Sequence, residues 1–195
     1  YLGAFASSAT LLYGTQTASS GASAYGTLIG LGGVQIVNGG AAISNTNLLS
    51  GGTQSLSAGG SAYYTTIGAA AIQNLAGALV VSSILNGLQY ISSAGVASST
   101  TINNGGIQTV YNLGSAMGAN ISSGGIQHIS SGGLANNVTI NNGGIQNISS
   151  AGLARIALIA NGGIQYVSVG GTATSTTLSG GTQNIAGGSA ISTTI

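Results

Sequence analysis

Few side chains in this chain could do chemistry, and none of them has a spacing that catalysis uses. Asp, Glu and Cys are absent, His128 is the only His, and Arg155 is the only Lys or Arg. Paired-acid hydrolysis and Ca²⁺ or Mg²⁺ binding need carboxylates, and a thiolate nucleophile or a Cys-ligated zinc needs Cys. A lone His has no acid to orient it as a catalytic base. We therefore expect no enzymatic activity, no catalytic or metal site, and no cofactor.

The two charged or titratable side chains fit a surface role. His128 follows Gln127 at a position that varies between repeats, so we expect an exposed spacer. Arg155 has no acid to pair with and is expected to be exposed. A net charge of +1 argues against nucleic acid, because such binding needs clustered Lys and Arg. No run of about 18 apolar residues is present, so no membrane insertion of this segment is expected.

The regular chemical pattern is a lattice of Gln residues. All ten Gln of the chain fall on it, at successive spacings of 19, 19, 19, 16, 19, 19, 19, 19 and 18 residues. The lattice consists of Gln16, Gln35, Gln54, Gln73, Gln89, Gln108, Gln127, Gln146, Gln165 and Gln183. The repeat is most regular in NNGGIQTV (103–110), SSGGIQHI (122–129), NNGGIQNI (141–148) and ANGGIQYV (160–167). So short a unit cannot bury its own apolar side, but stacked copies share a core.

The elements that carry these Gln residues are expected to be strands. Each repeat holds two apolar, β-branched runs bounded by Gly pairs, and the second run is seen in SAGVASSTTI (93–102) and SGGLANNVTI (131–140). Gly supplies the positive φ of tight corners, whereas each Gly inside a helix would cost about 1 kcal/mol. The pattern predicts an all-β, single-stranded β-solenoid of about ten coils of about 19 residues. Parallel crossovers are strongly right-handed, which favours a right-handed parallel β-helix.

The alternation around each Gln predicts a core column and an amide ladder. The residue two after Gln is apolar in every repeat, and the expected core column includes Val110, Ile129, Ile148, Val167 and Ile185. Side chains alternate between the two faces of a strand, so Gln points inward beside that column. A buried amide without a partner costs about 1–3 kcal/mol, which favours a ladder of Gln side chains between coils. The residue before Gln is also usually apolar, so either the strand bends there or a second surface covers it.

Two repeats depart from the consensus. The coil between Gln73 and Gln89 is three residues short and includes AGALVVSSILNG (76–87), and the coil of Arg155 reads AGLARIALIANGG (151–163). These segments are interpreted as drift or as contact patches. Residues 1–195 are expected to form a single continuous solenoid domain. Neither end carries a polar capping element, so we expect a fragment of a longer rod or a rod that stacks end to end.

The repeat resembles the passenger repeats of AIDA-type autotransporter adhesins. The features that carry the resemblance are GGIQ, one variable residue, Ile or Val, and then the second run, repeated across nearly the whole chain and most regular over 86–188. The resemblance implies a right-handed β-helix that is exported through a C-terminal β-barrel and is often glycosylated on Ser and Thr. It also implies adherence, self-aggregation and biofilm growth at a bacterial surface. The chain departs from that family in lacking scattered Asp, Lys and Arg.

The expected function is structural and adhesive, on the bacterial cell surface or in the extracellular space. The expected partners are other copies of the rod, through rod-rod or end-to-end contacts, and host-surface or matrix glycans. The alternative is a subunit of an extracellular filament that polymerises through uncapped solenoid ends. An ice-binding solenoid is a third interpretation. It rests on a Thr column (Thr66, Thr101, Thr139, Thr177 and Thr194) that Asn120 and Leu158 interrupt.

Overall fold

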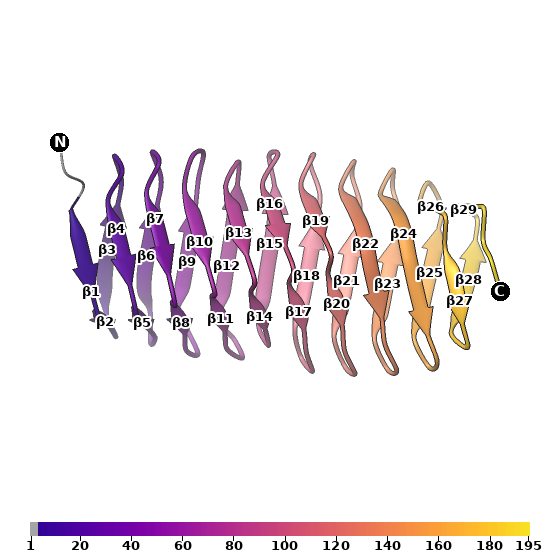
Figure 1. The fold of residues 1–195 in the computed structure, drawn as a ribbon, viewed down its shortest axis with the longest axis horizontal. Coiled ribbons are helices and arrows are strands. Elements are labelled where there is room, and N and C mark those ends of the chain that lie inside the picture. The colour runs from indigo at the N-terminus through magenta and orange to yellow at the C-terminus, as the bar shows by residue number, and fades with distance from the viewer. Residues whose placement is uncertain (1–3) are drawn as a thin grey trace.

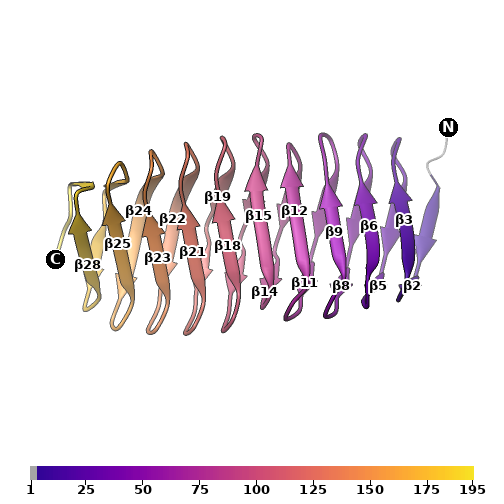
Figure 2. The ribbon, with the colours of Figure 1, turned by 180° about the vertical axis from the view of Figure 1, so that it is seen from behind.

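The computed structural model describes residues 4–195, which form an all-β parallel solenoid of about ten turns of about 19 residues. The coils stack along the long axis of Figure 1, and Figure 2 shows the opposite side of the same stack. The first and the last strands of the described chain lie at opposite ends of the rod (Figure 1). At about 4.8 Å per coil, ten coils span about 48 Å. Within residues 4–195 there is no helix long and apolar enough to cross a membrane.

One face of the rod is a ten-stranded parallel sheet that carries the Gln lattice. Each strand pairs with the equivalent strand of the next coil, so that Gln127 lies in register with Gln108 and Gln146. We refer to this sheet as the Gln sheet. Its strands are β3 (Gly14–Ala18), β6 (Gly33–Val37), β9 (Thr53–Leu56), β12 (Ile72–Ala76), β15 (Leu88–Ser92), β18 (Ile107–Val110), β21 (Ile126–Ile129), β23 (Ile145–Ile148), β25 (Ile164–Ser168) and β28 (Thr182–Ala186).

The second apolar run of each repeat forms the remaining 19 strands. It is divided by a bend in most coils, and we refer to this two-part surface as the bent sheet. Its strands are β1 (Phe5–Ser7), β2 (Thr10–Leu11), β4 (Ser23–Tyr25), β5 (Leu28–Ile29), β7 (Ala42–Ser44), β8 (Asn47–Leu48), β10 (Ser61–Tyr63), β11 (Thr66–Ile67), β13 (Leu79–Val81), β14 (Ile84–Leu85), β16 (Val96–Ser98), β17 (Thr101–Ile102), β19 (Ser115–Met117), β20 (Asn120–Ile121), β22 (Leu134–Ile140), β24 (Leu153–Ala160), β26 (Thr172–Thr174), β27 (Thr177–Ser179) and β29 (Ser189–Ile191).

The bend is a difference from the two strands per repeat that the sequence predicts. One residue in each coil has a positive φ at this position, for example Asn45 at 55°, Ser99 at 56° and Asn137 at 56°. A left-handed residue turns the strand direction, so one apolar run supplies two short strands and the coil has three sides. The bend residue is Ser, Asn or Gly in every described coil except two, and the recurrence of these small or turn-forming residues was the available sequence signal.

The core is the inward half of a strict alternation. In β18, β21 and β23 the burial pattern is the same, with Gln and the residue two after it buried and the two other positions half-buried. Val110, Ile129, Ile148 and Val167 are at most 1% exposed. Ile185 is a correction to the expected core column, because it is 53% exposed. It lies on β28, the last strand of the Gln sheet, where no further strand covers it.

The short coil keeps its register by losing residues only in its turns. Ser61 pairs with Leu79 and Ile67 with Leu85, an offset of 18 residues, whereas Ile72 pairs with Leu88, an offset of 16. The preceding coil pairs Gln54 with Gln73 at an offset of 19. One residue is therefore missing from the first turn and two from the second, and every strand still meets its counterpart.

The two residues of a Gly pair have different roles. Gly132 has a φ of +76° and no neighbour that a Cβ would meet. The backbone of Gly133 has no such conformation, but a Cβ there would lie 2.2 Å from the carbonyl oxygen of Val110 in the preceding coil. The first Gly thus supplies the turn conformation, and the second allows neighbouring coils to approach closely.

Candidate functional site

The most regular arrangement of functional groups is the amide ladder inside the Gln sheet. Each Gln Nε2 donates a hydrogen bond to the Oε1 of the Gln in the preceding coil, at distances of 2.5 to 2.8 Å. The Gln side chains from Gln35 to Gln165 are fully buried. All bonds run in the same direction, so the amide dipoles align and polarise one another. The ladder stabilises the stack and has no reactive group.

A second buried polar column faces the ladder, and the sequence interpretation missed it. Its hydroxyl members are at most 1% exposed: Thr27, Thr46, Thr65, Ser83, Thr100 and Thr176. Thr46 donates to the Oε1 of Gln35 at 3.4 Å, and Thr176 accepts from the Nε2 of Gln183 at 3.3 Å. The hydroxyls of Thr27, Thr65, Ser83 and Thr100 have no partner among the described residues.

The signal for this column was a Thr pair rather than a single Thr. Thr65-Thr66 and Thr100-Thr101 are consecutive, and the first Thr of each pair is buried while the second is half-buried. The expected Thr column is therefore the outward member of each pair. In register it alternates with Asn and aliphatic residues, as in Thr66 beside Ile84, so it is not a regular array.

His128 and Arg155 lie on the outside of different sheets. His128 is half-buried on the Gln sheet, and its Nδ1 lies 3.3 Å from the Nδ2 of Asn147. Desolvation by burial lowers the pKa of His128 below its ordinary value of 6.5. Arg155 is exposed on the bent sheet, in register with Asn136 and Thr174. Within residues 4–195 no three metal-ligating side chains lie close enough to hold an ion.

The position before Gln is aliphatic in most coils and forms an aliphatic row on the outer face of the Gln sheet. Ile107, Ile126, Ile145 and Ile164 are all half-buried, and the neighbouring outward position carries residues such as Thr109 and His128. The strands alternate without a bend, so the row faces outward. Adjacent side chains of the row cover one another in part because the strands pair in register.

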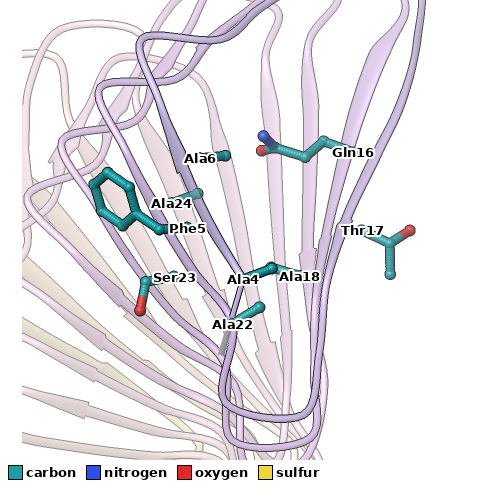
Figure 3. Close-up of a pocket in the computed structure, with 9 residues that line it drawn as sticks. All are labelled: Ala4, Phe5, Ala6, Gln16, Thr17, Ala18, Ala22, Ser23 and Ala24. Carbon is teal, nitrogen blue, oxygen red and sulfur yellow. The ribbon is translucent and has the colours of Figure 1, made fainter. Parts of the chain in front are cut away.

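A small hollow lies between the first coils, at the N-terminal end of the core. Its lining includes Ala6, Gln16, Ala18 and Ala24, whose side chains point into the interior, whereas Thr17 points away (Figure 3). The inward-pointing part of the lining is methyl groups and one amide that already serves the ladder, and the rest includes one Phe ring and two hydroxyls. The lining offers no acid or base that could activate a hydroxyl as a nucleophile.

These observations define a class of protein: a parallel β-solenoid with a buried amide ladder and an outer surface of polar, aliphatic and aromatic side chains with little charge. Among solved structures, the chain is similar to the crystal structure of the TibC-catalyzed hyper-glycosylated TibA55-350 fragment. The two share 28% sequence identity, with a TM-score of 0.54 over 98% of this chain and 97% of that chain. No protein-family model matches the chain, and no curated protein matches it.

Proposed function

We propose that this chain is a bacterial adhesive rod, displayed on the cell surface or secreted, that holds cells together through weak contacts repeated along its length. The observation that carries the proposal is the similarity over nearly the whole length of both chains to the hyper-glycosylated TibA fragment. The passenger repeats that the sequence resembles belong to adhesins of the same architecture.

The physical basis of adhesion is the repetition of neutral groups along a rigid rod. Equivalent outward positions recur at about 4.8 Å from coil to coil, so contacts that are weak singly add by multivalency. Arg155 is the only permanent side-chain charge of the sequence, so two rods meet with little electrostatic repulsion. Homotypic rod-rod contact, cell aggregation and biofilm growth follow from these two properties.

Glycosylation of outward Ser residues is part of the proposal, because the similar TibA fragment is described as hyper-glycosylated by TibC. Exposed Ser residues lie at the turns of consecutive coils, including Ser123, Ser131 and Ser150. A hydroxyl at an exposed corner is accessible to a transferase without unfolding a strand. Co-expression with such a transferase is expected to raise the intact mass by whole sugar units, and Ser131→Ala with Ser150→Ala is expected to lower that gain.

The adhesive function is tested by displaying the chain on non-aggregating bacteria through a heterologous translocator. Cells that display the rod are expected to settle from a still suspension faster than cells with an empty translocator. Mixing with differently labelled cells that also carry the rod gives mixed aggregates if the contact is homotypic. Equal settling with and without the rod would contradict the proposal, and end-to-end filaments of purified rod in electron micrographs would favour a polymerising subunit instead.

A further inference from the structure

Three exposed Tyr residues gather on one corner of the bent sheet. Tyr25 is 51% exposed, Tyr63 36% and Tyr64 62%. Tyr25 and Tyr63 end β4 and β10, immediately before the bend, and Tyr64 is the bend residue itself. The inward neighbours Ala24 and Ala62 are buried, so alternation places the rings of Tyr25 and Tyr63 on the outer surface.

Strand register fixes the separation of the Tyr25 and Tyr63 rings along the rod. Tyr25 pairs with Ser44, and Ser44 pairs with Tyr63, so the two Tyr residues occupy the same column two coils apart. Two coils correspond to about 9.6 Å along the rod. Between the rings lie half-buried Ser44 and exposed Asn45, which supply a hydroxyl and an amide. The corner therefore alternates aromatic and neutral hydrogen-bonding groups.

Tyr64 has a conformation that a bulky residue rarely adopts. Its φ is +54°, whereas the same bend is formed by Gly26, Asn45 and Ser82 in neighbouring coils. Gly and Asn adopt this conformation at little cost, but a bulky side chain there is an outlier. Ile156 is the other bulky residue at this bend within residues 4–195. Strain that is retained at an exposed side chain is typical of a site where that side chain is used.

The chemistry of the corner selects a neutral ligand with apolar faces. Aromatic rings have a negative face, which attracts the C–H groups on the face of a pyranose ring, while a hydroxyl and an amide bind sugar hydroxyls. Arg155 lies five coils beyond Tyr63 in the same sheet, about 24 Å away. That exceeds the screening length at physiological salt, so among the side chains of residues 4–195 a charged ligand meets no complementary charge at this corner.

We propose that Tyr25, Tyr63 and Tyr64 form a binding site for a neutral, extended β-1,4-linked glycan that lies along the rod. The separation of Tyr25 and Tyr63 along their column, two coils or about 9.6 Å, fits the repeat of two sugar rings in such a chain, so Tyr25 and Tyr63 stack on alternate rings. Ser44 and Asn45 bind the hydroxyls of the ring between them. The site extends the proposed adhesive function, on which its biological use rests, by naming a glycan partner.

The test is a calorimetric titration of the purified rod with two neutral probes, cellohexaose and chitohexaose. We expect saturable binding of at least one of them. Tyr25→Ala and Tyr63→Ala are each expected to weaken it roughly fivefold to a hundredfold, the range for loss of one aromatic stacking contact. Tyr63→Phe keeps the ring and is expected to bind as the unaltered rod does. The matched control is Tyr166→Ala, which removes a similarly exposed ring from the Gln sheet and leaves the affinity unchanged.

The Tyr64→Ser variant distinguishes a loss of glycan affinity from a loss of folding, because the two properties are expected to change in opposite directions. Ser fits the bend in other coils, for example at Ser99, so this variant is expected to unfold at a higher temperature than the unaltered rod and to bind the glycan more weakly. Absence of saturable binding of both probes, or equal affinity of Tyr25→Ala, Tyr63→Ala and the unaltered rod, would overturn the site. A Tyr25→Ala and Tyr63→Ala rod displayed on cells is expected to aggregate normally. Failure of the glycan site is thus distinguished from failure of the adhesive proposal.

Discussion

At the scale of single residues, each buried amide of the ladder depends on the coil before it and the coil after it. Gln127 donates to Gln108 and accepts from Gln146, and all three are fully buried. A Leu at this position would fill the same space in the core, but it would leave the Oε1 of Gln108 and the Nε2 of Gln146 without a hydrogen-bond partner. The ladder therefore couples the stability of each coil to that of the next.

Gln127→Leu is expected to lower the free energy of unfolding by about 2–5 kcal/mol, because one donor and one acceptor remain buried without partners. Chemical denaturation followed by circular dichroism measures the change. Gln16→Leu is the control, since Gln16 is half-buried and makes a single ladder bond. An equal loss in both variants would show that the ladder does not act as a chain of bonds.

For the column of buried hydroxyls we expect a substitution to raise the free energy of unfolding, whereas Gln127→Leu lowers it. The Oγ1 of Thr100 is buried without a partner, and Val138 and Ala119 occupy the same column in later coils. Thr100→Val is expected to raise the free energy of unfolding by about 1 kcal/mol because it removes an unsatisfied polar group. Thr46→Val removes a hydroxyl that donates to Gln35 and is expected to give no gain. A loss of stability in Thr100→Val would indicate that its hydroxyl has a partner in solution.

His128 is expected to give the rod a small dependence on pH. Burial lowers its pKa in the folded state, so folding disfavours the charged imidazole. The contribution to stability is fully present above pH 6.5 and is lost as the pH falls toward 5, where the unfolded chain binds the proton more readily. The sequence has no second His and no Asp, Glu or Cys. The His128→Asn variant is expected to have equal unfolding midpoints at pH 7 and pH 5. If the difference between the two midpoints persists in this variant, the pH dependence of stability belongs to another group.

At the scale of elements, strands and turns contribute differently to the register between coils. The strands keep their pairing even where the short coil loses residues, and the turns absorb the loss. Turns tolerate this because their outer residues face solvent, whereas a one-residue shift in a strand would exchange its inward and outward side chains. Drift is thus a sufficient explanation of the three missing residues.

Substitutions in a Gly pair test whether the close approach of two coils or the positive φ contributes more to the stability of a turn. Gly133→Ala places a Cβ against the carbonyl oxygen of Val110, so the coils must separate, and we expect a loss of about 2–3 kcal/mol, as for overpacking a close contact. Gly132→Ala adds a methyl group to open space and strains only the left-handed backbone, at about 1–2 kcal/mol. Thermal unfolding of the two variants gives the order. A larger loss in Gly132→Ala would mean that φ rather than close approach dominates this corner.

At the scale of the whole molecule, stability is a sum over coils and their contacts with neighbouring coils. Deletion of residues 109–127 joins Gln108 to His128 and keeps the repeat in phase. The shortened rod is expected to fold cooperatively, with a lower free energy of unfolding than the full chain. Deletion of 109–117 removes part of a coil and breaks the pairing on one side. It is expected to lower the unfolding temperature further, and equal midpoints would contradict a register-dependent stack.

The adhesive proposal also belongs to the whole molecule. No single outward residue identifies a partner, but the rod repeats the backbone positions of its surface at every coil while the side chains at those positions vary. The glycan site is an exception, because Tyr25 and Tyr63 recur in one column of only a few coils. A rod of this kind combines repeated contact along its length with a local site at one corner.

The sequence by itself determined the length of the coil, the all-β solenoid and the inward direction of the Gln lattice. These properties depend on periodicity and on the alternation of side chains along one strand, and both are local. The spacing of the Gln residues therefore gives the length of the coil. The apolar column two positions after each Gln gives the strand and the inward direction of the Gln side chain.

Only the tertiary structure decided the features that depend on neighbouring coils or on corner geometry. The bend at Asn137, the second buried column beginning at Thr27 and the exposure of Ile185 are of this kind. The same holds for the aromatic corner, since Tyr25 and Tyr63 lie two repeats apart and appear scattered in the sequence. Register between coils brings them into one column, because a parallel ladder places equivalent positions about 4.8 Å apart whatever their separation along the chain.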